Sequence, residues 1–259
     1  MRQLMVLLIA CFSASPLVQT PMLQSASAVA LLKKSATSMA RSAPNDSSAT
    51  GTINIVAGST SDNGSIQIQT LGSDATSEQV TGSSLRLTTI YSAGQANEII
   101  GSEPPKVLYM EGAASRQSVV FPLPLILGFL NSADTSYRDI GLESLNGDAV
   151  EHLRVSNTYT SQASLQQLAS YTTKDIWINV STFLPERISF LRFETGGTAA
   201  HGVPIDVSLS NYQNIGGVLY PSTIQESLDG TPWRTIQINT AAFNTGLSSS
   251  NFPIVQEAE

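Results

Sequence analysis

The stretch 174–194 limits the fold most strongly, because it has the pattern of two strands joined at Leu184-Pro185. Its first half alternates in period two, with Ile176 and Ile178 on one side and polar or aromatic residues on the other. In its second half, over residues 188–193, both sides are rather apolar. A sheet with two apolar faces must be covered on one face, and must pack against or hold something on the other.

Composition narrows the classes of function. The chain has 259 residues, a net charge of −7 and only 13% charged residues. No Lys/Arg cluster could neutralise phosphates, which argues against nucleic acid as a partner and against a basic patch on anionic lipid head groups. The chain has one cysteine and two histidines. These are too few for a thiolate site or for most zinc sites, so we expect no metal and no cofactor.

Residues 1–28 have the pattern of a secretory signal peptide. Arg2 supplies the positive start, and the apolar run 4–10 is shorter than the about 20 residues that span a bilayer. The triplets 26–28 and 28–30 both fit the small-x-small cleavage rule. Residues 8–11 also fit a bacterial lipobox, in which Cys11 would be lipidated and would attach the chain to a membrane. In either case we expect an exported protein, in the periplasm or at the outer membrane of a Gram-negative-type bacterium.

The mature chain is predicted to begin with a helix and a linker and to continue with strands. The segment 29–50 predicts a helix over 29–39 and a Ser/Ala-rich linker over 41–50. From Thr52 the pattern is that of strands, beginning with a hairpin of 52–56 and 65–70 around a turn at 59–64. The further strand candidates are 84–91, 95–100, 106–111, 137–144, 148–157, 203–212, 218–228 and 232–243.

Turn signals separate these strands, above all Asn146-Gly147, and one or two helical turns are expected over 164–171. About eleven strands at short spacing predict a mainly β domain over 51–255, with one large antiparallel sheet and a few helices.

The run 119–130 is the most hydrophobic part of the mature chain. Its two prolines suit the entry to a helix, and Leu125, Ile126, Phe129 and Leu130 then form a helical stripe. Two interpretations remain open. The helix is either a core element packed on the sheet, or a movable lid whose apolar face covers an apolar cavity.

Three motifs follow each other in the second half, namely GLESLNG at 141–147, DIWIN at 175–179 and LPER at 184–187. Asn211-Tyr212, the run 216–221 and Asn251-Phe252 continue the series. Over 136–255 this succession resembles the lipoprotein-carrier family of periplasmic and outer-membrane proteins (LolA/LolB-like).

The resemblance implies an unclosed antiparallel half β-barrel whose concave, hydrophobic face is covered by short helices. In that family the cavity binds acyl chains of lipoproteins or similar lipids, without metal and without chemistry. No motif fixes the position of the lid arginine of the family's chaperones, and Arg116 is a candidate by location only. The long Ser/Thr-rich N-terminal region departs from the compact carriers.

No catalytic constellation emerges. His152 and His201 are the only histidines available as a base, and no G-x-S-x-G elbow precedes a helix. We expect His152 to face solvent or a cross-strand partner. The carboxylates of Glu143, Asp148 and Glu151 straddle a hairpin, where surface roles explain them. Asp62 begins half of a calcium loop without the required Glu, which favours a turn.

Three functions compete. The first is an exported protein that binds a lipid, an acyl chain or another apolar ligand, and carries lipoproteins or lipids. The second is a structural envelope protein with a filled interior and envelope proteins as partners. The third and most remote is a secreted hydrolase. The residues expected to line an apolar cavity and its lid are Leu125, Ile126, Phe129, Ile178, Val180, Phe190, Val207 and Ile224.

Overall fold

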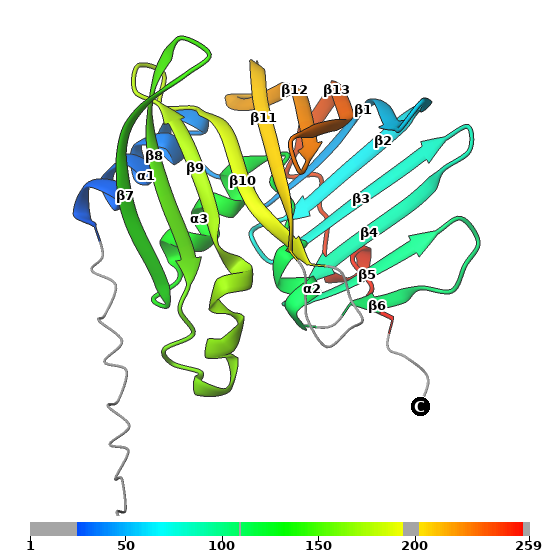
Figure 1. Cartoon of the computed structure of the whole chain (residues 1–259), viewed down its shortest axis with the longest axis horizontal. Coiled ribbons are helices and arrows are strands. Elements are labelled where there is room, and N and C mark those ends of the chain that lie inside the picture. Colours follow the sequence, from blue (N-terminus) through cyan, green and yellow to red (C-terminus); the bar gives the residue numbers. More distant parts are fainter. Residues whose placement is uncertain (1–24, 109, 194–201, 256–259) are drawn as a thin grey trace, which may run out of the picture.

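The computed structural model describes residues 25–108, 110–193 and 202–255, and a single antiparallel sheet dominates it (Figure 1). Its thirteen strands lie in the order β6-β5-β4-β3-β2-β1-β13-β12-β11-β10-β9-β8-β7, so β6 and β7 form the two edges. These edges do not pair with each other, and the curved sheet stays open. The predicted fold class, a large unclosed half-barrel with a few helices, is confirmed.

The first six strands form one side of the curve (Figure 1). Their bounds are β1 Asp46–Ala57, β2 Thr60–Leu71, β3 Ala75–Gly82, β4 Arg86–Ser92, β5 Gln95–Ile100 and β6 Lys106–Leu108. β3 was not predicted, because its sequence ATSEQVTG is mostly polar. Its ladders to β2 and β4 nevertheless satisfy the backbone of this segment.

The structure corrects three boundaries in this half. β1 already begins at Asp46, so residues 46–50 are not linker; Asp46 binds the backbone of Thr245 and Gly246. Of the expected turn at 59–64, residues 60–64 are strand, since Ala57 pairs with Thr60 across a tighter turn at 58–59. Asp62 therefore lies inside β2, where its carboxylate accepts hydrogen bonds from the 83–85 backbone. The third correction is the expected strand 106–111, which ends at residue 108 because a helix begins at residue 110.

The other seven strands complete the sheet. Their bounds are β7 Thr135–Leu145, β8 Asp148–Asn157, β9 Lys174–Asn179, β10 Pro185–Phe193, β11 Gly202–Ile215, β12 Val218–Leu228 and β13 Thr231–Phe243. Asn146 and Gly147 both have positive φ, the conformation that a two-residue hairpin turn requires. That predicted hairpin and the β9–β10 pair around Leu184-Pro185 are both present.

The helices are short. They comprise α1 Ala26–Met39, α2 Met110–Ser115, α3 Pro122–Asn131 and the 3₁₀ helices η1 Ala163–Thr172 and η2 Ser249–Asn251. Ser25 caps α1, its side chain accepting a hydrogen bond from the Ala28 amide. The triplets expected as cleavage sites therefore lie within α1. Most of the expected signal peptide, including Cys11, lies outside the described residues.

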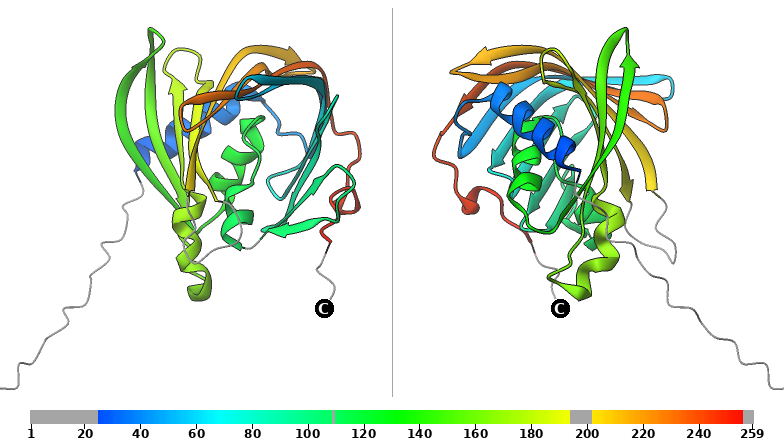
Figure 2. Two further views of the ribbon diagram at one scale, coloured as in Figure 1. Left: turned by 45° about the vertical axis from the view of Figure 1, so that its right-hand side comes forward. Right: turned by 90° about the vertical axis from the view of Figure 1, so that its left-hand side faces the viewer.

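The main hydrophobic core lies on the concave side of the sheet. Figure 2 shows the sheet arching over α3, with α1 beside it. α1 contributes Leu32 and Met39 to this core, and α3 follows a stack of Phe121 on Tyr220 with 4.5 Å between the ring centroids. α1, α3 and the sheet therefore form one packed unit.

The chain after β13 covers part of the convex side. Phe252 is buried against Ala75 and Ile90, and the side chain of Asn97 exchanges two hydrogen bonds with the Val255 backbone. This segment ties the C-terminal part to β3–β5. Among the described helices, none has the length and apolarity needed to cross a membrane.

Candidate functional site

The residues expected to line an apolar cavity do lie on one side of the sheet. Seven of the eight belong to the main core cluster: Leu125, Ile126, Phe129, Ile178, Phe190, Val207 and Ile224. The eighth, Val180, is half-buried in the turn after β9. The strand residues Ile178, Phe190, Val207 and Ile224 thus belong to the core, and their role in holding a ligand stays a prediction. These seven side chains share one cluster with Leu32 and Met39 of α1, so most of this part of the interior is filled.

A cleft of about 250 Å³ remains open beside α3. Leu125, Gly128 and Phe129 of α3 form its apolar side, and Tyr91 and Tyr159 supply rings. Its other lining residues are Ser73, Gln117, Ser132, Asp134, Asn157 and Gln162. We call this hollow the mouth cleft.

A second hollow of about 60 Å³ lies deeper on the concave side, and we call it the charged chamber. Three glutamates and three arginines line it: Glu78, Glu98, Glu226, Arg116, Arg192 and Arg234. The segment 115–119 between α2 and α3 closes one side, and Gln117 lines both the chamber and the mouth cleft. The two hollows therefore adjoin at Gln117.

Ion pairs hold the walls of the charged chamber together. Arg234 Nη2 lies 2.5 Å from Glu226 Oε1 and 3.1 Å from Glu78 Oε2. Burial opposes ionisation of Glu226, but Arg234 and Arg192 outweigh it and hold the pKa of that carboxyl below its usual range. Burial likewise disfavours the cation of Arg234, yet Glu226 and Glu78 raise its pKa above the ordinary value. These groups are charged in the folded protein.

Arg116 is the arginine that the sequence placed near the apolar helix. In the structure its Nη2 lies 2.8 Å from Glu98 Oε1, and its side chain is buried in the chamber wall. Arg192 is less well paired, with Nη2 3.7 Å from Glu226 Oε2. Arg192 lies on the same face of β10 as Phe190, but no sequence pattern connects it with Glu226, two strands away.

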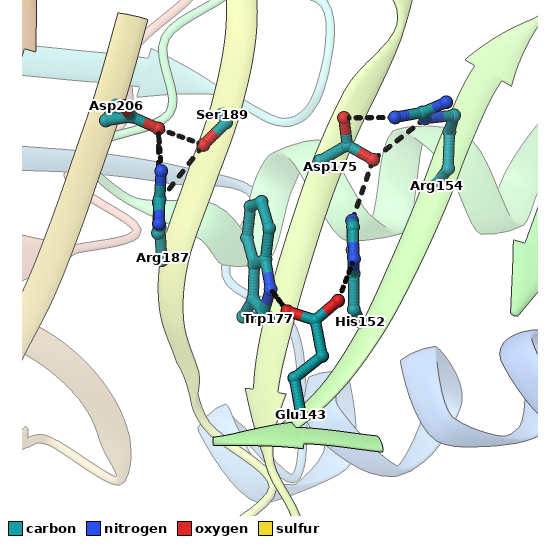
Figure 3. Close-up of polar contacts among 8 residues, drawn as sticks. All are labelled: Glu143, His152, Arg154, Asp175, Trp177, Arg187, Ser189 and Asp206. Carbon is teal, nitrogen blue, oxygen red and sulfur yellow. Dashed lines mark hydrogen bonds and ion pairs between the residues drawn. The ribbon is translucent and has the colours of Figure 1, made fainter. Parts of the chain in front are cut away.

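A separate polar cluster lies on the opposite, convex face of β7–β11. Figure 3 shows its members, Glu143, His152, Arg154, Asp175, Trp177, Arg187, Ser189 and Asp206, in front of the strands with the helices behind. Beside it lies a groove of about 410 Å³, which Asp175, Ser189, Leu191 and Asp206 help to line.

His152 is at the centre of this outer cluster. Its Nδ1 lies 2.8 Å from Glu143 Oε1 and its Nε2 2.9 Å from Asp175 Oδ1, while its ring stacks on Trp177 at 4.2 Å (Figure 3). It thus meets cross-strand partners, as expected. Both ring nitrogens are occupied, so neither is free to take a proton from a nucleophile. The hydroxyl of Ser189 donates to Asp206 and not to His152.

The remaining candidates for chemistry do not come together. Glu143 binds His152 on the convex face, whereas burial and the neighbouring Asp139 raise the pKa of Glu151. Asp139 accepts a hydrogen bond from Ser27 of α1. His201 lies outside the described residues. Within the described ranges, no group of three or more His, Cys, Asp or Glu side chains could hold a metal ion.

Comparison with known proteins identifies the fold. No protein-family model and no curated protein matches the chain. Solved structures do match, and three of those with probability 1.00 have TM-scores of 0.56 to 0.59. A protein of Vibrio parahaemolyticus described as an outer membrane lipoprotein-sorting protein domain is 12% identical, with TM-score 0.59, covering 87% of this chain and 96% of that one.

The other two are as similar. A LolA superfamily protein of Nitrosomonas europaea is 14% identical, with TM-score 0.57, covering 88% and 97% of the two chains. A DUF1329 family protein of Desulfovibrio piger is 12% identical, with TM-score 0.56, covering 88% and 96%. At this identity the likeness concerns the fold. The chain has a LolA-like fold, in agreement with the resemblance found in the motifs of its second half.

Proposed function

We propose that the protein is an exported, non-enzymatic protein of the bacterial cell envelope that binds a lipid or acyl chain on the concave side of its half-barrel. It serves as a carrier, with α3 as a lid over the apolar part of the site. The apolar residues Leu125, Phe129 and Phe190 contact the chain of the ligand.

The position of α3 carries this proposal. All but two of its ten residues are Leu, Ile, Phe or Pro, and it lies inside the curve of an open sheet (Figure 2). Leu125 and Phe129 border the mouth cleft, although each is at most 3% exposed. An outward shift of α3 would therefore expose apolar surface of both the helix and the sheet at the existing opening. Apolar burial contributes about 25 cal/mol per Å², enough to hold an acyl chain there.

The names of the similar structures support a role in lipid or lipoprotein binding. Two of the three similar structures are named a lipoprotein-sorting domain and a LolA superfamily protein. Export follows from the signal-like pattern of residues 1–28.

A reversible cross-link tests the lid. A Cβ added at Gly128 would lie 2.8 Å from Ser73 Cβ, and a disulfide needs about 3.8 Å, so a small shift allows a Ser73→Cys/Gly128→Cys bridge. In a Cys11→Ser background, binding of a fluorescent fatty acid is measured before and after reduction. We expect the oxidised form to bind poorly and the reduced form to bind well.

The single variant Gly128→Cys is the control, because it adds the same side chain without the bridge. Equal binding by the oxidised and reduced forms would show that α3 is no lid. No binding by any form, native protein included, would reject the carrier function.

The filled interior favours a second candidate. Ligand pockets usually measure about 300 to 1,000 Å³, and neither hollow on the concave side reaches that range, at about 60 and about 250 Å³. A structural or interaction protein of the envelope would need no larger space. This candidate becomes the better one if native protein takes up no acyl probe.

A further inference from the structure

Not every donor in the charged chamber has an acceptor among the described residues. Glu226 accepts hydrogen bonds from Arg234 and from Trp233 Nε1. Glu78 accepts from Arg234 and Ser118, and Glu98 pairs with Arg116. Each carboxylate is thus already paired with a cation. Arg192 remains at 3.7 Å from Glu226, and its Nε has no hydrogen-bond partner among the described residues.

Lys174 adds a fourth cation to these three arginines. It pairs with Phe190 across β9 and β10 and is 1% exposed. Its Nζ lies 4.5 Å from the centroid of the Phe190 ring. In the described ranges Nζ donates no hydrogen bond, whether to a carboxylate or to any other acceptor. Burial, with a smaller effect from Arg192, lowers the pKa of Lys174 to about 7. A buried ammonium without a counter-ion is costly for the folded protein.

The position of these donors indicates how a ligand would be oriented. Phe190 and Arg192 both line the charged chamber, so Lys174 lies directly beside its wall. The chamber adjoins the mouth cleft at Gln117, and the cleft has the apolar side of α3. Cations thus lie at the inner end and apolar residues toward the opening. This order matches an amphipathic molecule that enters head first.

We infer that Lys174 and Arg192 bind the anionic head group, a carboxylate or phosphate oxyanion, of the ligand that the half-barrel holds. This inference rests on the proposed function and names the class of its ligand. The oxyanion supplies the acceptors that Lys174 Nζ and Arg192 Nε lack, while the acyl chain extends past Gln117 toward Leu125 and Phe129.

The test compares palmitic acid with methyl palmitate, which has the same chain but no charge. Native full-length protein should bind the acid about tenfold more tightly, because a hydrogen bond to a charged group is usually worth at least that factor. Lys174→Met and Arg192→Met should bind both probes equally, at the affinity that native protein has for the ester. Lys33→Met, an exposed change on α1, should keep the native preference.

Thermal unfolding separates a binding role from a structural one. Lys174→Met removes a buried unpaired charge, so it should raise Tm without ligand while it abolishes the preference for the acid. Because the folded-state pKa of Lys174 is lowered to about 7 from an ordinary 10.5, the gain should be largest below pH 7. It should shrink as the pH rises toward 10.5. A lysine kept for stability would lower Tm when replaced.

The outcomes distinguish the two proposals. Equal affinity of native protein for acid and ester would overturn the head-group site and leave the carrier function standing. Failure of both probes to bind would overturn the carrier function. In that case, inorganic phosphate alone tests whether the site binds a free anion in place of a lipid head group. If phosphate raises the Tm of native protein but not of Lys174→Met, the site takes a free anion; if it changes neither, the anion site is rejected.

Discussion

The two halves of the concave interior differ in how completely the chain fills them. Next to β7–β9, α1 and α3 cover the sheet with their own apolar side chains, and Leu32, Leu125 and Ile126 are at most 1% exposed. Next to β3–β5 the interior contains arginines and glutamates around a hollow of about 60 Å³. Apolar side chains fill the first half, whereas in the second half donors of Lys174 and Arg192 have no acceptor among the described residues. The head-group site proposed above lies in the charged half.

The largest effect is expected from breaking the charged half. Arg234→Met leaves Glu226, whose side chain is 1% exposed, and Glu78 without their shared cation. Removal of one partner from a buried ion pair costs about 3 to 5 kcal/mol of unfolding free energy. Urea unfolding measures the loss.

Arg154→Met is the matched control on the convex face. Arg154 also pairs with a carboxylate, Asp175, but its side chain is 48% exposed. Such surface pairs contribute about 0 to 1 kcal/mol. The double variant Arg234→Met/Glu226→Gln should recover part of the loss, since it leaves fewer unpaired charges. Equal losses in Arg234→Met and Arg154→Met would contradict the contrast between the two faces.

A somewhat smaller effect is expected in the apolar half. Phe129→Ala removes a ring that is 3% exposed and should cost about 3 kcal/mol, because the surrounding core only partly collapses into the space. The hydrogen bond from Tyr137 to the Phe129 carbonyl stays, since it involves the backbone. The space opens beside the mouth cleft, so acyl probes should bind more tightly although the protein is less stable.

Leu142→Ala provides the comparison, because Leu142 is 68% exposed and its loss should change stability by less than about 0.5 kcal/mol. If Phe129→Ala weakens probe binding in proportion to stability, the apolar half is structural and does not hold the ligand.

Most strands and turns could be predicted from the sequence because they have local sequence patterns. Ile176 and Ile178 alternate with polar or aromatic neighbours, and Asn146-Gly147 permits the positive φ of a tight hairpin. β3 was missed because Thr76, Ser77 and Glu78 lack apolar alternation. Its strand conformation depends on pairing with β2 and β4, which a local pattern does not contain.

The charged chamber could not be predicted for a related reason. Glu78, Arg192 and Glu226 lie far apart in sequence and meet only through the order of the sheet. Lys174 gave no signal of its own, since a lysine at the start of a strand is usually exposed. The apolar candidates were easier, because period two puts Ile178 and Val207 on the apolar side of their own strands, although it does not fix which side faces the core.

The smallest effect is expected at the outer cluster, and it should depend on pH. Trp177 and then His152 donate hydrogen bonds to Glu143 and hold the pKa of that carboxyl below its usual 4.5. A carboxyl with a lowered pKa in the folded state adds stability above its unfolded pKa, and the contribution disappears as the pH falls through the folded value. Glu143→Gln should therefore lower Tm slightly at pH 7 and not at all at the acid end of the profile. Glu103→Gln, at an exposed turn residue without such donors among the described contacts, should show no pH-dependent difference. A Tm loss for Glu143→Gln that persists in acid would mean that the ring stack of His152 on Trp177, and not the charge of Glu143, stabilises the convex face.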